Sequence, residues 1–241
     1  MEIYGLSKYA SILLNKSIFF CKSSIMGDPY EGMLTTADYN HIKSMLGDDR
    51  DDGNALRRWA KNPLDRYVVS CWHIADYESA AMWSLYGLRG QSIAITARFS
   101  DLVDQMPPFV KCGPVNYVDF ATDGCYFREN KGTDIRILTK RREFRHEAEY
   151  RFFFNAVGYL GQSFHRHCSQ PKDGSGFYVK ITPCQAIKGV VTDPFAPQWF
   201  ADLVHEFSEV NGLQCGVKQS CLMSEPNYDP VEIEEQVNSD R

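Results

Sequence analysis

The stretch FRHEAEYRFFF, residues 144–154, places two glutamates beside an apolar run. The run 152–154 is typical of a core strand, whereas glutamates are poor strand formers and costly to bury. Because residues two apart on a strand share a face, we expect Glu147, Glu149 and Arg151 to lie on one side of this strand. Carboxylates on one face repel each other unless a cation or a wet cleft receives them. The stretch therefore predicts either a salt-bridge ladder, with Arg151 beside Glu149, or a strand that lines a cleft.

The composition is that of an ordinary globular chain. Of the 241 residues, 44% are hydrophobic and 24% are charged, which supplies enough apolar material for a sizeable core. The net charge of −5, without a long basic block, excludes wrapping of duplex nucleic acid by phosphate neutralisation alone. We expect one domain over residues 1–223, followed by an acidic, flexible tail over 224–241.

The sequence has no pattern of membrane insertion or export. No apolar run approaches the roughly 20 residues that span a bilayer. The first residues, MEIYGLSKYA, lack the basic and then apolar layout of a signal peptide. We therefore expect a soluble, cytoplasmic protein without a membrane partner.

Eight cysteines raise the question of disulfides or zinc, and their spacing favours neither. No CxxC pair occurs, and most of the cysteines lie in apolar, strand-like runs, where free cysteine behaves as a small buried hydrophobe. The tightest group of possible metal ligands is His165, His167 and Cys168, in a stretch whose composition is typical of a surface loop. Zinc sites show more regular spacing, so we predict a structural or incidental role for this group and no metal site.

Hydrophobic periodicity and turn residues predict a strand-rich α+β domain. Tyr4 lies in a very short strand that leads directly into the first helix. Further strands are expected at 17–24, 66–73, 91–99, 113–120, 147–155, 176–182, 187–194 and 215–223. Helices are expected at 9–14, 78–87, 133–144 and 197–212, two of them ended by Gly87 and Gly212.

Two further segments combine residue types that bind ligands. The turn MGDPYEG, residues 26–32, carries Asp28 and Glu31, although a capped turn would use the same residues. The strand SCWH and the helix AMWSLYG carry four candidate binding residues: Ser70, Trp72, Trp83 and Tyr86. An aromatic stripe of this kind also suits an ordinary core, so both interpretations stay open.

Three of these segments together resemble a widespread bacterial family of unknown function. Its members share an early NDPfE-type turn, a CFS…MWshYa…G strand and helix, and a late W..E.EyR strand. This chain has MGDPYEG, SCWHIADYESAAMWSLYG and FRHEAEYRF in the same order, over roughly residues 3–222. It departs from the pattern at Gly27, His73 and Phe144, where the family has Asn, often Ser, and Trp.

The order of elements resembles the ADP-ribosyltransferase fold, a split sheet with flanking helices. The resemblance implies that NAD is the substrate. It implies Glu149, in a strand similar to the AEfLV strand of DNA-modifying members, as the main catalytic carboxylate. Glu147 and Tyr4 would assist it. The residues implied to bind NAD are Ser70, Trp72, Trp83, Tyr86 and Asp28.

The residues themselves suit that chemistry. Cleavage of the nicotinamide–ribose bond passes through an oxocarbenium-like state, which a well-placed carboxylate stabilises. Two other functions remain open. A metal-dependent nuclease or phosphoesterase would use Asp28, Glu31, Glu147 and Glu149 as oxygen ligands. A non-catalytic nucleotide- or partner-binding module would use the aromatic side chains for stacking alone.

Bacterial enzymes of this chemistry act as toxins or phage-defence effectors, so the resemblance implies such a role and an inhibitory partner protein. The acceptor of the ADP-ribosyl group would be a protein or a nucleic acid. The segment RILTKRREFR, residues 136–145, concentrates five basic residues beside the expected catalytic strand. We predict that a nucleic-acid acceptor docks across Arg141, Arg142 and Arg145; a solvated helix face is the alternative.

Overall fold

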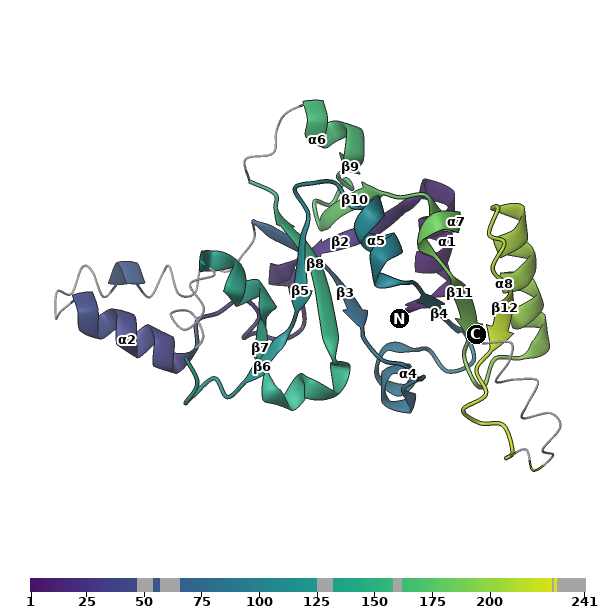
Figure 1. Cartoon of the computed structure of the whole chain (residues 1–241), viewed down its shortest axis with the longest axis horizontal. Helices are drawn as coiled ribbons and strands as arrows, with labels where there is room; N and C mark the ends of the chain where they lie inside the picture. The colour runs from purple at the N-terminus through teal and green to yellow at the C-terminus, as the bar shows by residue number, and fades with distance from the viewer. Residues whose placement is uncertain (47–53, 57–65, 125–131, 158–161, 227, 229–241) are drawn as a thin grey trace.

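Two main sheets with helices around them form the α+β fold that the sequence predicts (Figure 1). The structure is a computed structural model, and it describes residues 1–46, 54–56, 66–124, 132–157, 162–226 and 228. Within these residues, no helix is both long enough and apolar enough to cross a membrane. Most of the predicted tail, residues 227 and 229–241, lies outside the described residues.

The larger sheet has the strand order β5-β8-β3-β2-β10-β9, and each neighbouring pair is antiparallel. The strand predicted from the opening stretch is β8, which lies between β5 and β3. The strands are β2 (Ser17–Lys22), β3 (Tyr67–His73), β5 (Lys111–Pro114), β8 (Glu149–Asn155), β9 (Cys168–Ser169) and β10 (Gly176–Lys180).

The second sheet has the order β1-β4-β11-β12, and a small parallel pair, β6 and β7, lies apart from both sheets in the strand pairing. The strands of the second sheet are β1 (Glu2–Gly5), β4 (Ser92–Thr96), β11 (Gly189–Thr192) and β12 (Val217–Gln219). The small pair consists of β6 (Asn116–Val118) and β7 (Thr139–Arg141).

The helices connect and cover these sheets (Figure 1). The chain passes from β3 to β4 through α4, which begins where the Ser79 hydroxyl accepts the N–H of Met82 at 3.3 Å and ends at Gly87. The α-helices are α1 (Leu6–Asn15), α2 (Thr36–Leu46), α4 (Ala80–Tyr86), α5 (Phe99–Gln105), α6 (Gln162–His167), α7 (Pro183–Ala186) and α8 (Gln198–Val210). The 3₁₀ helices are η1 (Ser23–Ile25), η2 (Gly132–Leu138) and η3 (Arg142–Glu147).

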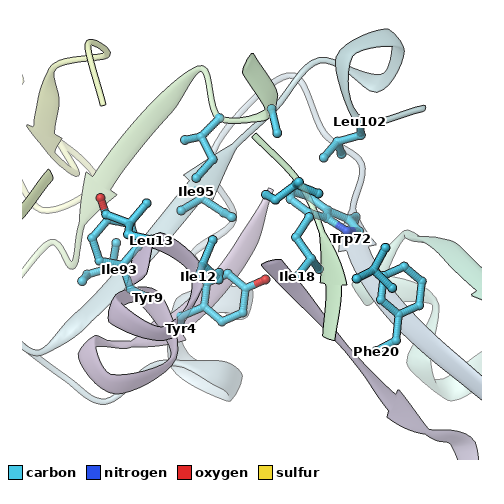
Figure 2. Close-up of a cluster of buried hydrophobic side chains, with 14 of the residues drawn as sticks. Tyr4, Tyr9, Ile12, Leu13, Ile18, Phe20, Trp72, Ile93, Ile95 and Leu102 are labelled. Atoms are coloured by element: carbon cyan, nitrogen blue, oxygen red, sulfur yellow. The ribbon is translucent and has the colours of Figure 1, made fainter. Parts of the chain in front are cut away.

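The two faces of the β3–β8 pair have different surroundings. Trp72 pairs with Tyr150, and on that face Trp72 and Phe152 belong to the main core. Figure 2 shows Trp72 in this core with Ile18 and Phe20. On the opposite face, His73 pairs with Glu149. Because side chains alternate along a strand, Arg151 shares the face of Glu149 and is separated by the sheet from the main core.

Three predictions about local structure are wrong. The strand β8 begins at Glu149, because Ala148 has a left-handed backbone (φ 40°) that interrupts extended structure between Glu147 and Glu149. The expected helix over 133–144 is instead η2, β7 and the start of η3, since the residues there bury polar side chains such as Lys140 rather than present one exposed face. The expected loop around His165 is α6 followed by β9.

Candidate functional site

Five charged side chains meet on the face of β8 that turns away from the main core. We call them the buried ionic cluster: Glu31, Lys140, Glu147, Glu149 and Arg151. They come from the turn after η1, from β7, from the end of η3 and from β8. None is more than 7% exposed. Charged groups are rarely buried unless they are paired, so the cluster must satisfy its own charges.

Arg151 is the innermost member, with 1% exposure. Its two terminal nitrogens donate to the two carboxylate oxygens of Glu31, both at 2.8 Å, and its Nε donates to Glu149 Oε2 at 2.6 Å. Nη1 also donates to the carbonyl of Ile137 at 2.7 Å. A bidentate guanidinium–carboxylate pair is strong and geometrically specific. Arg151 therefore fixes the turn at Glu31 against β8.

Lys140 joins the carboxylates at the other end of the cluster. Its Nζ donates to Glu149 Oε1 at 2.5 Å and to Glu147 Oε2, and it lies 3.7 Å from Glu31 Oε1. Burial alone would lower the pKa of this ammonium. The charge of Glu149 and the hydrogen bonds to Glu147 and Glu149 outweigh burial and raise the pKa above its ordinary value. Lys140 therefore stays charged.

The cluster contains one more carboxylate than it has cations. Glu31, Glu147 and Glu149 face Lys140 and Arg151, three negative groups against two positive ones. Burial and the hydrogen bond with Glu149 raise the pKa of Glu147 to about 7. Burial opposes ionisation of Glu149 too, but the neighbouring Arg151 lowers the pKa of that carboxyl well below its ordinary value. The surplus proton, when present, therefore belongs to Glu147.

Two tyrosines complete the surroundings of the glutamates. The Tyr86 hydroxyl, at the end of α4, donates to Glu147 Oε1. The Tyr117 hydroxyl accepts the backbone N–H of Glu149 at 2.8 Å. Tyr86 is 50% exposed, whereas Glu147 is 2% exposed. Tyr86 is therefore the point at which the hydrogen-bonded cluster meets solvent.

A second ion pair holds the turn next to Glu31. Arg141 donates to both carboxylate oxygens of Asp28, at 2.9 and 3.2 Å, and its guanidinium lies 4.5 Å from the centre of the Tyr30 ring. The backbone N–H of Glu31 donates to the carbonyl of Asp28 at 3.0 Å. Asp28 thus supports the position of Glu31 and is itself occupied by Arg141.

The structure brings together only part of the predicted site. Glu147, Glu149 and Tyr86 meet in one hydrogen-bonded group, and the expected pairing of Arg151 with Glu149 is confirmed. Ser70 and Trp72, which the resemblance implies to bind NAD, do not lie beside Glu149. Both lie on the opposite face of the sheet, where Trp72 Nε1 donates to Ser70 Oγ at 3.1 Å.

Trp83 and Tyr4 also occupy structural positions. Trp83 is 5% exposed, and its indole N–H, its one polar group, donates to Glu78 Oε2 at 3.0 Å. Tyr4 is 8% exposed and belongs to the main core (Figure 2), where its hydroxyl is hydrogen-bonded to Glu2. The partners of these two residues, Glu78 and Glu2, are not members of the buried ionic cluster.

The segment 136–145 does not form the expected basic strip. Arg136 and Lys140 are buried, and Arg136 donates to the carbonyl of Gly32 at 2.7 Å. Arg141 is bound to Asp28, and Arg142 pairs with Asp119 at 3.0 Å, while Arg145 is exposed. Because two of the three proposed docking residues already have acidic partners, the segment offers little free positive charge to a phosphate backbone.

Sequence reasoning missed Lys140, Tyr117 and His73 as parts of the site. The sequence pattern suits an exposed helix face at Lys140. The one signal of a buried cation is the number of carboxylates in the neighbouring segments, Glu31, Glu147 and Glu149. His73 donates from Nδ1 to the carbonyl of Glu147 at 2.6 Å. His73 follows Trp72 in the predicted strand, so its side chain lies on the opposite face from Trp72, which is the face of Glu149.

The carboxylates proposed as metal ligands are engaged with cations instead. Asp28 binds Arg141, Glu31 binds Arg151, and Glu147 and Glu149 share Lys140. Across the described ranges, no three His, Cys, Asp or Glu side chains are arranged as a metal site. The residues present therefore do not resemble a ready set of hard oxygen ligands.

Comparisons with models of protein families, with curated proteins and with solved structures give no match to this chain. The resemblances to the bacterial family of unknown function and to ADP-ribosyltransferases therefore stay predictions.

Replacing a cation of the cluster should destabilise the protein far more than replacing its surplus carboxylate. Arg151→Met leaves three carboxylates with one cation, so we expect a loss of about 3–5 kcal/mol in the free energy of unfolding. Glu147→Gln resembles the protonated acid and should change it by less than about 1 kcal/mol. Urea titrations measure both values.

Arg142→Met is the matched control, because Arg142 is an exposed arginine whose ion pair with Asp119 lies at the surface. Its effect should be within about 1 kcal/mol. Equal stabilities of the Arg151 and Arg142 variants would contradict the role of Arg151 as the anchor of the cluster.

The raised pKa of Glu147 predicts a pH-dependent stability. Between its ordinary value of 4.5 and about 7, the folded state binds this proton more tightly than the unfolded state does. Stability from Glu147 is therefore complete below 4.5 and is lost as pH rises through about 7. Burial raises the pKa of Glu2 to about 7 as well, so wild type should lose stability through both groups.

The two contributions are separated by substitution. Urea titrations across this pH range should show a smaller loss of unfolding free energy for Glu147→Gln than for wild type. Glu2→Gln should still show the part of the loss that is due to Glu147. An unchanged pH profile in Glu147→Gln would show that its carboxyl is ionised throughout the range.

Proposed function

We propose that this chain is an enzyme that cleaves the N-glycosidic bond of NAD, in the class of ADP-ribosyltransferases and NAD glycohydrolases. One observation carries the proposal. A buried cluster with one more carboxylate than cations reaches solvent through the half-exposed Tyr86, whose hydroxyl donates to the buried carboxylate of Glu147. Such a group suits a reaction in which positive charge develops on a sugar ring.

Glu147 is the carboxylate proposed to contact substrate. Its Oε1 accepts one hydrogen bond, from Tyr86, and a ribose hydroxyl offers the same kind of donor. When the hydroxyl takes that place, the surplus charge of the cluster lies beside the ribose carbon from which nicotinamide leaves. A fixed, buried charge stabilises the oxocarbenium-like state more than the neutral ribose, because no solvent reorganisation is needed.

Glu149 then acts behind Glu147 rather than on the substrate. Its two oxygens bind Lys140 and Arg151, which keep it ionised and fix the ammonium that orients Glu147. The surroundings thus push the pKa values of the two glutamates apart, an arrangement that enzymes use to divide acid–base and electrostatic roles. The exposed ring of Tyr86 offers a face for the flat nicotinamide.

The biological setting of the proposal rests on the sequence resemblance. It places the enzyme in the bacterial cytoplasm as a toxin or phage-defence effector that modifies a protein or nucleic acid and is restrained by an inhibitory partner.

Release of nicotinamide from NAD tests the proposal. Wild type should release nicotinamide, and Glu147→Gln should lower kcat on the order of 10²–10³-fold, as loss of one preorganised electrostatic group does. Glu143→Gln is the matched control, since Glu143 is exposed on the same 3₁₀ helix, and it should keep wild-type activity. Circular dichroism checks that each variant is folded.

Three results would contradict the proposal. Wild-type protein that releases no nicotinamide would remove it, as would a folded Glu147→Gln variant with undiminished turnover. Cleavage of a phosphodiester that requires a divalent cation would favour the nuclease alternative instead. Binding of NAD without turnover would favour a nucleotide-binding module.

A further inference from the structure

His73 is a buried histidine, and one of its ring nitrogens has no hydrogen-bond partner among the residues that the structure describes. It is 7% exposed and is the last residue of β3, directly opposite Glu149 on β8. Its Nδ1 lies 2.6 Å from the carbonyl oxygen of Glu147, while Nε2 is buried without a hydrogen bond. Cross-strand neighbours have Cβ atoms about 4.5–5.5 Å apart, so the imidazole lies beside the buried ionic cluster.

The carbonyl of Glu147 determines which nitrogen carries the proton. A carbonyl oxygen only accepts hydrogen bonds, so Nδ1 must be the N–H that points to it. In the neutral imidazole the other nitrogen, Nε2, is then unprotonated and presents a lone pair. An unsatisfied buried acceptor is costly to a folded protein, and such groups occur where function requires them.

The backbone around His73 holds the imidazole in this orientation. The backbone N–H of His73 donates to the carbonyl of Met1 at 2.8 Å, and the amino group of Met1 donates to the carbonyl of His73 at 2.7 Å. The next residue, Ile74, donates its N–H to the carbonyl of Ala148 at 2.9 Å. His73 is thus fixed between β1 and the connection from η3 to β8.

We infer that His73 is a catalytic base of this site, which takes the proton of the attacking nucleophile at Nε2. The inference rests on the proposed function. A water or acceptor hydroxyl bonds through oxygen to the ribose carbon while the carbon–nitrogen bond to nicotinamide breaks, and that electron pair neutralises the pyridinium. The hydroxyl proton passes to Nε2, and the imidazolium then releases it to solvent. The products are nicotinamide, the ADP-ribosyl adduct and one proton.

His73 and Tyr86 both hydrogen-bond Glu147, the imidazole at its backbone carbonyl and the tyrosine hydroxyl at its carboxylate. A substrate that displaces the Tyr86 hydroxyl would therefore bind at the residue that orients His73. Catalytic hydrogen bonds often form fully only when substrate is bound, and the enclosed state of Nε2 without ligand agrees with this.

The substitution His73→Asn distinguishes the roles of the two imidazole nitrogens. The asparagine amide can still donate to the carbonyl of Glu147, in the place of Nδ1, but nothing replaces Nε2. Nicotinamide release should fall about 10²–10⁴-fold, with the thermal midpoint nearly unchanged. His205→Asn, at an exposed histidine of α8, is the control and should keep wild-type turnover.

The pH profile distinguishes a base from a structural residue. The dependence of kcat on pH should differ between wild type and His73→Asn, because the variant lacks the group that takes the proton of the nucleophile. A folded His73→Asn protein with wild-type turnover, or with the wild-type pH profile, would overturn the inference.

A second measurement does not require turnover. Imidazole nitrogen NMR of wild type at neutral pH should show the Nδ1–H tautomer of His73, assigned with His73→Asn, and addition of ADP-ribose should shift the Nε2 signal. A protonated Nε2, or an Nε2 that does not respond, overturns the inference. Absence of nicotinamide release from wild type overturns the proposed function and the catalytic role of His73 with it, while NMR still decides whether Nε2 is an open acceptor.

Discussion

The site depends on the burial of one arginine. Arg151, with 1% of its surface exposed, can remain charged inside the protein only because Glu31 and Glu149 accept its donors. That requirement brings the turn at Glu31 onto β8, and Lys140 then joins Glu149 to Glu147 at the end of η3. Segments far apart in the sequence are thus held by charge in addition to the apolar contacts of Ile137 with Val69 and Phe153. A well-packed apolar cluster would be at least as stable, so stability alone does not explain the arrangement.

The surplus carboxylate gives the arrangement its chemical character. With two cations and three carboxylates, the cluster has a negative charge that its own residues cannot cancel, and Glu147 carries it next to Tyr86. His73 adds an imidazole whose tautomer is fixed by the backbone of the same glutamate. The proposed function would use the carboxylate to stabilise positive charge on the sugar and the open nitrogen to remove a proton.

The sequence predicted the strands and helices better than the site. Alternation in SCWH and the run of phenylalanines identified β3 and β8, and Gly87 marked the end of α4. Parity along β8 correctly placed Glu149 and Arg151 on one face. The same parity wrongly placed Glu147 in the strand, because nothing about an alanine in the sequence predicts the left-handed backbone that Ala148 adopts. Lys140 was missed because the burial of a lysine depends on carboxylates that are distant in the sequence. Ser70 and Trp72 were misplaced because tertiary packing determines which face of a strand lies against the core.

Direct titration of the Glu147 carboxyl is the measurement closest to the central claim. Carbon NMR of the glutamate side chains, with the Glu147 signal assigned from Glu147→Gln, gives the pH at which this group loses its proton. The account predicts a midpoint near 7, because burial and the hydrogen bond with Glu149 leave the surplus proton on Glu147. A midpoint at or below the ordinary value of 4.5 would mean that Glu147 does not hold the surplus proton, and would contradict the account.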